Sequence, residues 1–269
     1  MRYYLQIDGM SVLRKEPGSE ATRERIARLG MQDCKWEHTT TACACVVCIW
    51  ILRRRAGAVK RNNDDDNVAV DGLLGRMIRF SAAGKPLVAF HSPARPIPRA
   101  RGGVLVFLGG LTDGLLATPY VERLCARVYL ECGFSVVQPV LSSSYLGYGV
   151  SSLQQDCDEL DALLGSLPAP CGPVVIMGHS TGCQISVAFV RCGKRRGMVR
   201  GVVLQAPVSD REYMATLPET AGHLELAGQL LAAGDGQQLM PRDADEAPIT
   251  AERYASLAGR NGPDDLFSS

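Results

Sequence analysis

The sequence predicts an α/β fold built on a mostly parallel sheet with helices on both faces. Two observations support this prediction. Short apolar runs alternate with runs of helical spacing from about residue 72 onward, and glycine-rich or polar turns follow the apolar runs. Such alternation is typical of βαβ units, whose right-handed crossovers place helices on both faces of the sheet. Ligands bind such sheets at the carboxyl ends of the strands, so we expect a functional site there.

Composition limits the classes of protein to be considered. The chain has 269 residues, of which 46% are hydrophobic and 21% charged, as in a globular protein with a sizeable core. A formal net charge of +1 gives no indication of binding to nucleic acid or to an anionic membrane. Ten cysteines are too few for a disulfide scaffold at this length, so we expect reduced thiols and a cytoplasmic location. Nothing in the composition predicts the oligomeric state.

The first 70 residues differ in composition from the rest of the chain. They end in the polar, charged run KRNNDDDN at 60–67, which is typical of a linker. We therefore predict a poorly structured or lineage-specific extension at 1–70 and one domain at 71–269. The longest apolar run, at 42–52, is too short for a membrane span, which needs about 20 residues.

A loose cluster of cysteines and one histidine lies in the same N-terminal part. Zinc sites normally need two ordered pairs of ligands in polar surroundings, whereas several of these residues lie in the apolar run. We therefore expect neither a metal nor a cofactor. The cluster consists of Cys34, His38, Cys43, Cys45 and Cys48.

The domain is expected to open with a hairpin and to continue with alternating strands and helices. A helical cap insertion is expected at about 211–260, with the stretch at 215–233 as a roof over the site. The expected elements are a hairpin at 77–91, strands at 103–108, 134–141, 173–177 and 199–207, and helices at 120–133, 151–167 and from about 181.

The strongest functional signal is the segment GHSTG at 178–182, between an expected strand and an expected helix. In this setting G-x-S-x-G is typical of a nucleophile elbow, a turn so tight that larger residues in place of its two glycines would collide with their neighbours. Ser180 is then lifted out of the sheet, close to a helix N-terminus that favours developing negative charge. The simpler interpretation is a glycine-rich turn with an incidental serine.

A second glycine-rich segment, GGLTDG at 109–114, follows the strand at 103–108. In hydrolase sheets this loop donates one backbone N–H to the oxyanion hole, and the residue after the nucleophile donates the other. Those donors would be Leu111 (or Thr112) and Thr181. The alternatives are an ordinary turn or a phosphate loop, but GGLTDG matches neither of the usual phosphate-binding motifs.

Together with the next motifs along the chain, these segments resemble a known family. GGLTDG, LSSSYLGYG, MGHSTGCQ and LQAPVSDRE, with PDDLFSS near the end, resemble the uncharacterised α/β-hydrolase family found in fungi and plants. The resemblance covers about residues 72–269. It implies an α/β-hydrolase fold, Ser180 as the nucleophile and a helical insertion after Pro207. For fungal relatives it implies ester hydrolysis, including that of siderophore-type esters.

The resemblance also implies that the chain is incomplete. Family members continue beyond the FSS motif with two further strands that carry the catalytic Asp and His, whereas this chain stops at Ser269. We therefore expect the last strands of the sheet to be missing and an apolar sheet edge to be exposed.

The residues alone give only weak candidates for the rest of a catalytic triad. The expected chain order is Ser, then Asp or Glu, then His, and Asp210 and His223 follow Ser180 in that order. His223, however, lies in an expected cap helix, and Asp210 is placed to begin the insertion. The side chain of His179 should point away from Ser180, and Cys183 is expected to pack beneath the helix.

The leading hypothesis is a serine hydrolase that acts on an ester or related acyl bond of a small molecule. With its Asp and His segment absent, the chain is expected to have little activity. An acyltransferase could use the same turn with an alcohol or amine in place of water. A non-catalytic binding protein could keep the fold without the triad.

Overall fold

The computed structural model describes residues 73–93, 102–168 and 171–268, and, by their backbone alone, three short strands near the N-terminus. The expected boundary near residue 70, the apolar run at 42–52 and the side chains of the cysteine cluster lie outside the described residues. Within the described ranges no helix is both long and apolar enough to cross a bilayer.

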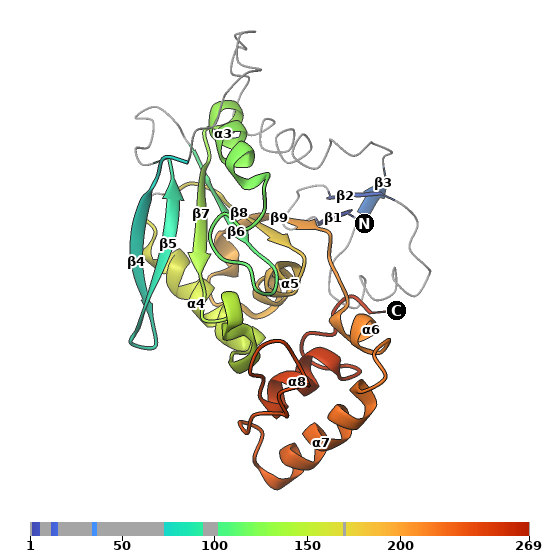
Figure 1. The fold of residues 1–269 in the computed structure, drawn as a ribbon. Helices are drawn as coiled ribbons and strands as arrows, with labels where there is room; N and C mark the ends of the chain where they lie inside the picture. Colours follow the sequence, from blue (N-terminus) through green and yellow to red (C-terminus); the bar gives the residue numbers. More distant parts are fainter. Residues whose placement is uncertain are drawn as a thin grey trace.

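Nine strands form one sheet in the order β3-β2-β1-β9-β8-β6-β7-β5-β4 (Figure 1). The central strands β7, β6, β8 and β9 are parallel to one another. At one side of the sheet, β5 is antiparallel to both β7 and the edge strand β4. All five residues of β6 are buried, as expected of a strand covered on both faces. The strands of the domain are β4 (Arg76–Ala82), β5 (Lys85–Ser92), β6 (Val104–Leu108), β7 (Ser135–Val140), β8 (Val174–His179) and β9 (Val199–Gln205).

The expected hairpin is confirmed as β4 and β5, paired from Arg76↔His91 to Ala82↔Lys85. Its two turn residues, Ala83 and Gly84, have φ angles of 46° and 80°. Positive φ at both central residues is what a two-residue hairpin turn requires to match the twist of its strands.

Helices cover both faces of the sheet, as predicted. Helix α3 (Val121–Cys132) packs on one face with alternate residues of the central strands, and it ends at Gly133, whose φ is 66°. Helices α4 (Leu153–Ser166) and α5 (Gly182–Cys192) pack on the other face.

The far end of α5 is tied to α4 by one side chain. The carboxylate of Asp161, on α4, accepts hydrogen bonds from the backbone N–H groups of Lys194 (2.7 Å) and Arg195 (2.6 Å), which follow α5. These charge-assisted bonds fix the chain where it leaves α5.

The outer edge of β9 is not open, contrary to the sequence-based expectation. Strand β1 (Arg2–Leu5) pairs antiparallel with it, from Arg2↔Gln205 to Leu5↔Val202. Strands β2 (Val12–Lys15) and β3 (Cys34–Trp36) extend the sheet further. The backbone N–H and C=O groups of β9 that the prediction left unpaired form hydrogen bonds with β1, so this edge is not exposed to another chain.

The helices of the expected insertion gather beyond the end of the sheet toward which β7 points (Figure 1). They are α6 (Asp210–Met214), α7 (Thr220–Ala233) and α8 (Ala251–Ala258). A separate apolar cluster, which includes Tyr148, Met240 and Tyr254, joins α7 and α8 to the short 3-10 helix at Tyr145–Val150. The cap therefore has its own small core.

Candidate functional site

Ser180 lies at a tight turn between β8 and α5. Its φ is 51°, in the left-handed region that non-glycine residues rarely adopt. The Ser180 N–H donates to the carbonyl of Gln205 on β9 (3.0 Å), and its carbonyl accepts from the N–H of Cys183 (3.0 Å). The backbone bonds on both sides of Ser180 hold the residue in this strained conformation.

The two glycines of the turn have no room for a side chain. A Cβ on Gly182 would lie 2.4 Å from the carbonyl oxygen of Leu108 and 2.5 Å from that of Gly109. A Cβ on Gly178 would lie 2.4 Å from the carbonyl oxygen of Gly182. The collisions predicted from the sequence are thus present in the structure, and they involve backbone atoms that cannot rotate away.

The loop at 109–114 comes next to the side chain of Ser180, which is half-buried. A Cβ on Gly110 would lie 2.9 Å from Ser180 Cβ and 3.3 Å from Ser180 Oγ. Only a residue without a side chain allows this approach of the loop to the hydroxyl.

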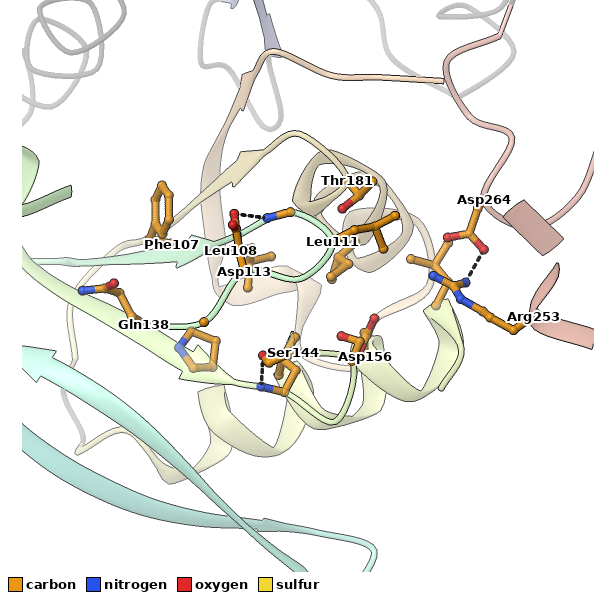
Figure 2. Close-up of a pocket in the computed structure, with 18 residues that line it drawn as sticks. Phe107, Leu108, Leu111, Asp113, Gln138, Ser144, Asp156, Thr181, Arg253 and Asp264 are labelled. Atoms are coloured by element: carbon orange, nitrogen blue, oxygen red, sulfur yellow. Dashed lines mark hydrogen bonds and ion pairs between the residues drawn. The ribbon is translucent and has the colours of Figure 1, made fainter. Parts of the chain in front are cut away.

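Asp113 closes that loop on itself. Its carboxylate accepts a hydrogen bond from the Gly110 N–H (2.7 Å), and its own N–H donates to the Gly110 carbonyl (3.2 Å). Among the described residues, neither the Leu111 N–H nor the Thr181 N–H has a hydrogen-bond acceptor. These are the two amides that the sequence nominates as oxyanion donors, and the side chains of both residues line one cavity (Figure 2).

The cavity lies beside the turn and has a volume of about 40 Å³. Its wall joins the loop at 109–114 to the end of β7, the start of α4 and α5, and the cap. Ser143 and Ser144, from the LSSSYLGYG motif, also line it. The lining comprises Phe107, Leu108, Gly109, Gly110, Leu111, Asp113, Gly114, Gln138, Pro139, Leu141, Ser143, Ser144, Leu153, Asp156, Thr181, Ile185, Arg253 and Asp264.

The cap contributes to this wall from α8 and the C-terminal segment, through Arg253 and Asp264. The stretch at 215–233, predicted to roof the site, supplies none of the lining residues. Its helix α7 packs instead against α8, on the far side from the sheet (Figure 1). The expected position of the roof was therefore wrong.

The imidazole of His179 contacts Gln205 and Tyr120. Its Nδ1 lies 2.5 Å from Oε1 of Gln205, which also accepts a hydrogen bond from the hydroxyl of Tyr120 (2.6 Å). The His179 and Tyr120 rings pack edge to face with centroids 6.1 Å apart. The imidazole is thus held toward Gln205, as the expected divergence from Ser180 requires.

The structure does not bring Asp210 and His223 together. Asp210 begins α6 and accepts a hydrogen bond from Gln184 Nε2 (3.0 Å), and burial raises its pKa to about 6. The Nε2 atom of His223, on α7, lies 3.8 Å from Oδ1 of Asp243, and its ring packs edge to face on Tyr254. Neither side chain hydrogen-bonds to Ser180 among the described residues.

Two further expectations concern thiols and metals. Cys183, near the start of α5, is fully buried in the core with its thiol directed at the Gly178 carbonyl (3.3 Å), so it packs beneath the helix as predicted. This burial raises the pKa of the thiol to about 12. Within the described ranges, no group of three or more His, Cys, Asp or Glu residues is arranged to hold a metal ion.

Three buried charged residues of the cavity wall were not singled out from the sequence: Asp156, Arg253 and Asp264. A signal for Asp156 was available. It lies four residues before Leu160 and eight before Leu164, and so shares their helical face, which is buried. Arg253 likewise lies four residues before the buried Leu257 on α8, whereas Asp264 follows α8 in a segment without helical or strand periodicity.

Family models provide an independent comparison. Residues 81–269 match the family described as "Protein of unknown function (DUF1749)". The chain belongs to the DUF1749 family.

Two curated relatives match the chain over part of their own length. UPF0613 protein PB24D3.06c of Schizosaccharomyces pombe is 33% identical over 209 residues, which are 72% of this chain and 64% of that protein. Esterase AN6793 of Emericella nidulans is 32% identical over 223 residues, with 61% of this chain and 59% of that protein covered. The chain thus spans less than two thirds of the length of these relatives.

Solved structures establish the fold. Siderophore hydrolase EstB from Aspergillus fumigatus is 27% identical with a TM-score of 0.55, covering 75% of this chain and 70% of that one. An α/β-hydrolase-fold protein of unknown function is 24% identical with a TM-score of 0.51, covering 67% of this chain and 61% of that one. The DUF1749 domain of this chain therefore has the α/β-hydrolase fold predicted from its sequence.

Proposed function

We propose that this chain carries the acyl-binding and nucleophilic part of an ester hydrolase that acts on a small molecule. The observation that carries the proposal is the strained turn at Ser180, with φ of 51°, beside two backbone amides without acceptors. The similarity to two proteins named as an esterase and a siderophore hydrolase supports the same chemistry.

In the proposed reaction, the Ser180 hydroxyl oxygen attacks the ester carbonyl carbon and the hydroxyl proton passes to a water molecule, since no described side chain hydrogen-bonds to the Ser180 hydroxyl. The N–H groups of Leu111 and Thr181 bind the oxyanion that forms. Removal of one such donor typically costs about 2.7–4 kcal/mol of transition-state stabilisation. The C–O bond then breaks, the alcohol leaves with a proton, and water releases the acyl group from Ser180.

We further propose that the 269-residue polypeptide turns over slowly. None of the three described histidines hydrogen-bonds to Ser180: His179 is held by Gln205, His223 lies beside Asp243, and neither ring nitrogen of His91 has a hydrogen-bond partner among the described residues. Loss of a triad member leaves an enzyme with residual catalysis from its oxyanion hole and binding, about 10³–10⁴-fold over water.

A fluorophosphonate probe tests the proposed nucleophile. The full chain is incubated with the probe, and the site of the adduct is identified by mass spectrometry. Because no described histidine hydrogen-bonds to Ser180, we expect slow formation of an adduct at Ser180 that Ser180→Ala abolishes and that Ser81→Ala, a change at an exposed serine on β4, leaves intact. An adduct that survives Ser180→Ala would contradict the assignment. Turnover of p-nitrophenyl acetate far above that of Ser180→Ala would contradict the expected low activity.

The second candidate is a binding protein that keeps the fold without catalysis. It is favoured by the same observation that no described histidine bonds to Ser180. Failure of the probe to label a folded chain would support this candidate over the hydrolase.

A further inference from the structure

Asp156 is a buried carboxylate with one oxygen that has no partner. The residue is 2% exposed, and its Oδ1 forms no hydrogen bond. The carboxyl group interacts with the side chain of Ser143. The carboxylate points into the cavity, toward the side where Leu111 and Thr181 lie (Figure 2). An unpaired buried acceptor is destabilising, and more so when it is charged, so a ligand that supplies a donor here gains affinity.

The balance of charge around the cavity leaves this carboxylate without a cation of its own. Arg253 is the sole cationic side chain among the described lining residues, and three lining residues are acidic: Asp113, Asp156 and Asp264. The Arg253 guanidinium hydrogen-bonds to other groups: its Nη1 donates to Asp264 Oδ2 (2.6 Å), and its Nε donates to the Tyr148 carbonyl (2.9 Å).

The size and lining of the cavity suit a small polar group at the end of an apolar chain. About 40 Å³ accommodates roughly three groups the size of a water molecule. Leu108, Leu141, Leu153 and Ile185 provide apolar contacts for methylene groups. The same cavity is lined by the two residues whose amides are the proposed oxyanion donors, so a substrate bound at Ser180 can extend into it.

We propose that this cavity is a substrate subsite for an ammonium group, which forms an ion pair with Asp156. The preferred substrates are then esters of small molecules that carry a protonated amine, and in that respect the inference rests on the proposed ester hydrolysis. The ammonium ion supplies the missing donor and the missing positive charge together, whereas water supplies only the donor.

The titration of Asp156 gives this subsite a pH dependence. Burial raises the pKa of the Asp156 carboxyl to about 7. The groups that face it are Ser143, Arg253 and Asp264, and Glu159 on its own helix. Because an ammonium ion binds the ionised carboxylate, its affinity should weaken about tenfold between pH 8 and pH 6, as the competent fraction falls.

Calorimetric titration of the full chain carrying Ser180→Ala tests the subsite without turnover. The probes are methyl 6-aminohexanoate and its uncharged isostere, methyl heptanoate. At pH 8 we expect the ammonium ester to bind at least tenfold more tightly than the isostere, and this preference to disappear in Asp156→Asn. Asp158→Asn is the matched control, since Asp158 lies on the same helix with its side chain 49% exposed.

Equal affinity for the two esters, or a preference that Asp156→Asn leaves unchanged, would overturn the inference and leave the cavity a water site only. If Asp156→Asn does not fold, the pH series on the parent decides, because a preference that stays flat from pH 6 to pH 8 is incompatible with Asp156 as the binding group. Labelling of Ser180 without any ammonium preference defeats this inference alone. An ammonium preference without labelling defeats the proposed hydrolysis and leaves the subsite standing.

Discussion

The Arg253 guanidinium lies 2.6 Å from the Asp264 carboxylate, and both residues are about 6% exposed. This pair joins α8 of the cap to the PDD sequence near the end of the chain. The hydroxyl of Ser256 donates to the same carboxylate oxygen (2.6 Å). A buried ion pair is stable only when short, well-aligned hydrogen bonds compensate for the loss of hydration. Loss of either partner leaves the other charge buried and unpaired.

Replacement of Arg253 by Met should therefore destabilise the protein strongly. We expect a loss of about 3–5 kcal/mol in the free energy of unfolding, because Asp264 then remains buried without a cation. Urea titration followed by circular dichroism measures the loss. Lys194→Met is the control: it breaks an exposed pair with Asp158, at 3.5 Å, and should cost less than about 1 kcal/mol. Similar losses in the two variants would refute the assigned role of the buried pair.

Gly182→Ala should disrupt the turn at Ser180. The added methyl group meets the Leu108 and Gly109 carbonyl oxygens, so α5 must move away from β6, and we expect a loss of about 1–3 kcal/mol or more. Gly228→Ala is the matched control, since its Cβ meets nothing within 4 Å on α7. The control should gain about 0.5–1 kcal/mol from helix propensity. Thermal unfolding of both variants separates these outcomes, and a neutral Gly182→Ala would contradict the described packing.

Asp113→Ala should loosen the loop that carries Leu111. The Gly110 N–H loses its acceptor, and the proposed oxyanion donor is no longer held beside Ser180. We expect fluorophosphonate labelling of Ser180 to slow by about 10–100-fold, as misplacement of a catalytic group by about 1 Å can do. Asp113→Asn keeps an acceptor oxygen and should recover much of the rate. Equal labelling rates in the parent and Asp113→Ala, at matched melting temperatures, would exclude a positioning role.

Asp156 should make the protein less stable as the pH rises from about 4 to about 7. Its pKa is raised from 3.8 to about 7 in the folded state, so within this window the folded chain retains a proton that the unfolded chain has released. The penalty is absent below the unfolded pKa and complete above the folded one. Asp156→Asn should thus stabilise the protein by about 2–4 kcal/mol at pH 8 and have little effect at pH 4.

Unfolding of Asp156→Asn across this pH range checks the expectation. Asp210, whose pKa is raised to about 6, contributes a smaller slope of the same sign that should remain in the variant. Asp158→Asn, at an exposed position of the same helix, should follow the parent curve. A parent curve that rises from pH 4 to pH 7 would show that other groups dominate.

The elements of the domain followed closely from local patterns in the sequence. The hairpin turn needs positive φ at two residues, and Gly84 signals one of them, whereas Ala83 gives no such signal; α3 ends at a glycine in the left-handed conformation. Strand β8 continues two residues beyond the apolar run, through Gly178 and His179, because its ladder with β9 extends to Gln205. That extension depends on a neighbouring strand and leaves no mark in the local sequence.

The candidate site was predictable only in its backbone. GHSTG and GGLTDG identify the turn and the loop, because their glycines are required by close approaches of backbone atoms. The charged wall of the cavity depends on tertiary packing: Arg253 reaches Asp264 and Tyr148 across the cap, contacts that no periodicity encodes. For the same reason the sequence assigned the roof to α7, whose composition is apolar, rather than to α8.

The clamp at Asp161 has a consequence at the opposite end of α5. Because the helix is anchored by Lys194 and Arg195 at one end and wedged against Leu108 at Gly182, it cannot slide to let Ser180 relax. The positive φ angle of Ser180 is therefore kept in the folded protein, and its energetic cost arises during folding. Under the proposed function, an ester that binds at Ser180 would therefore meet the proposed oxyanion donors, the N–H groups of Leu111 and Thr181, in a backbone that needs little reorganisation during the reaction.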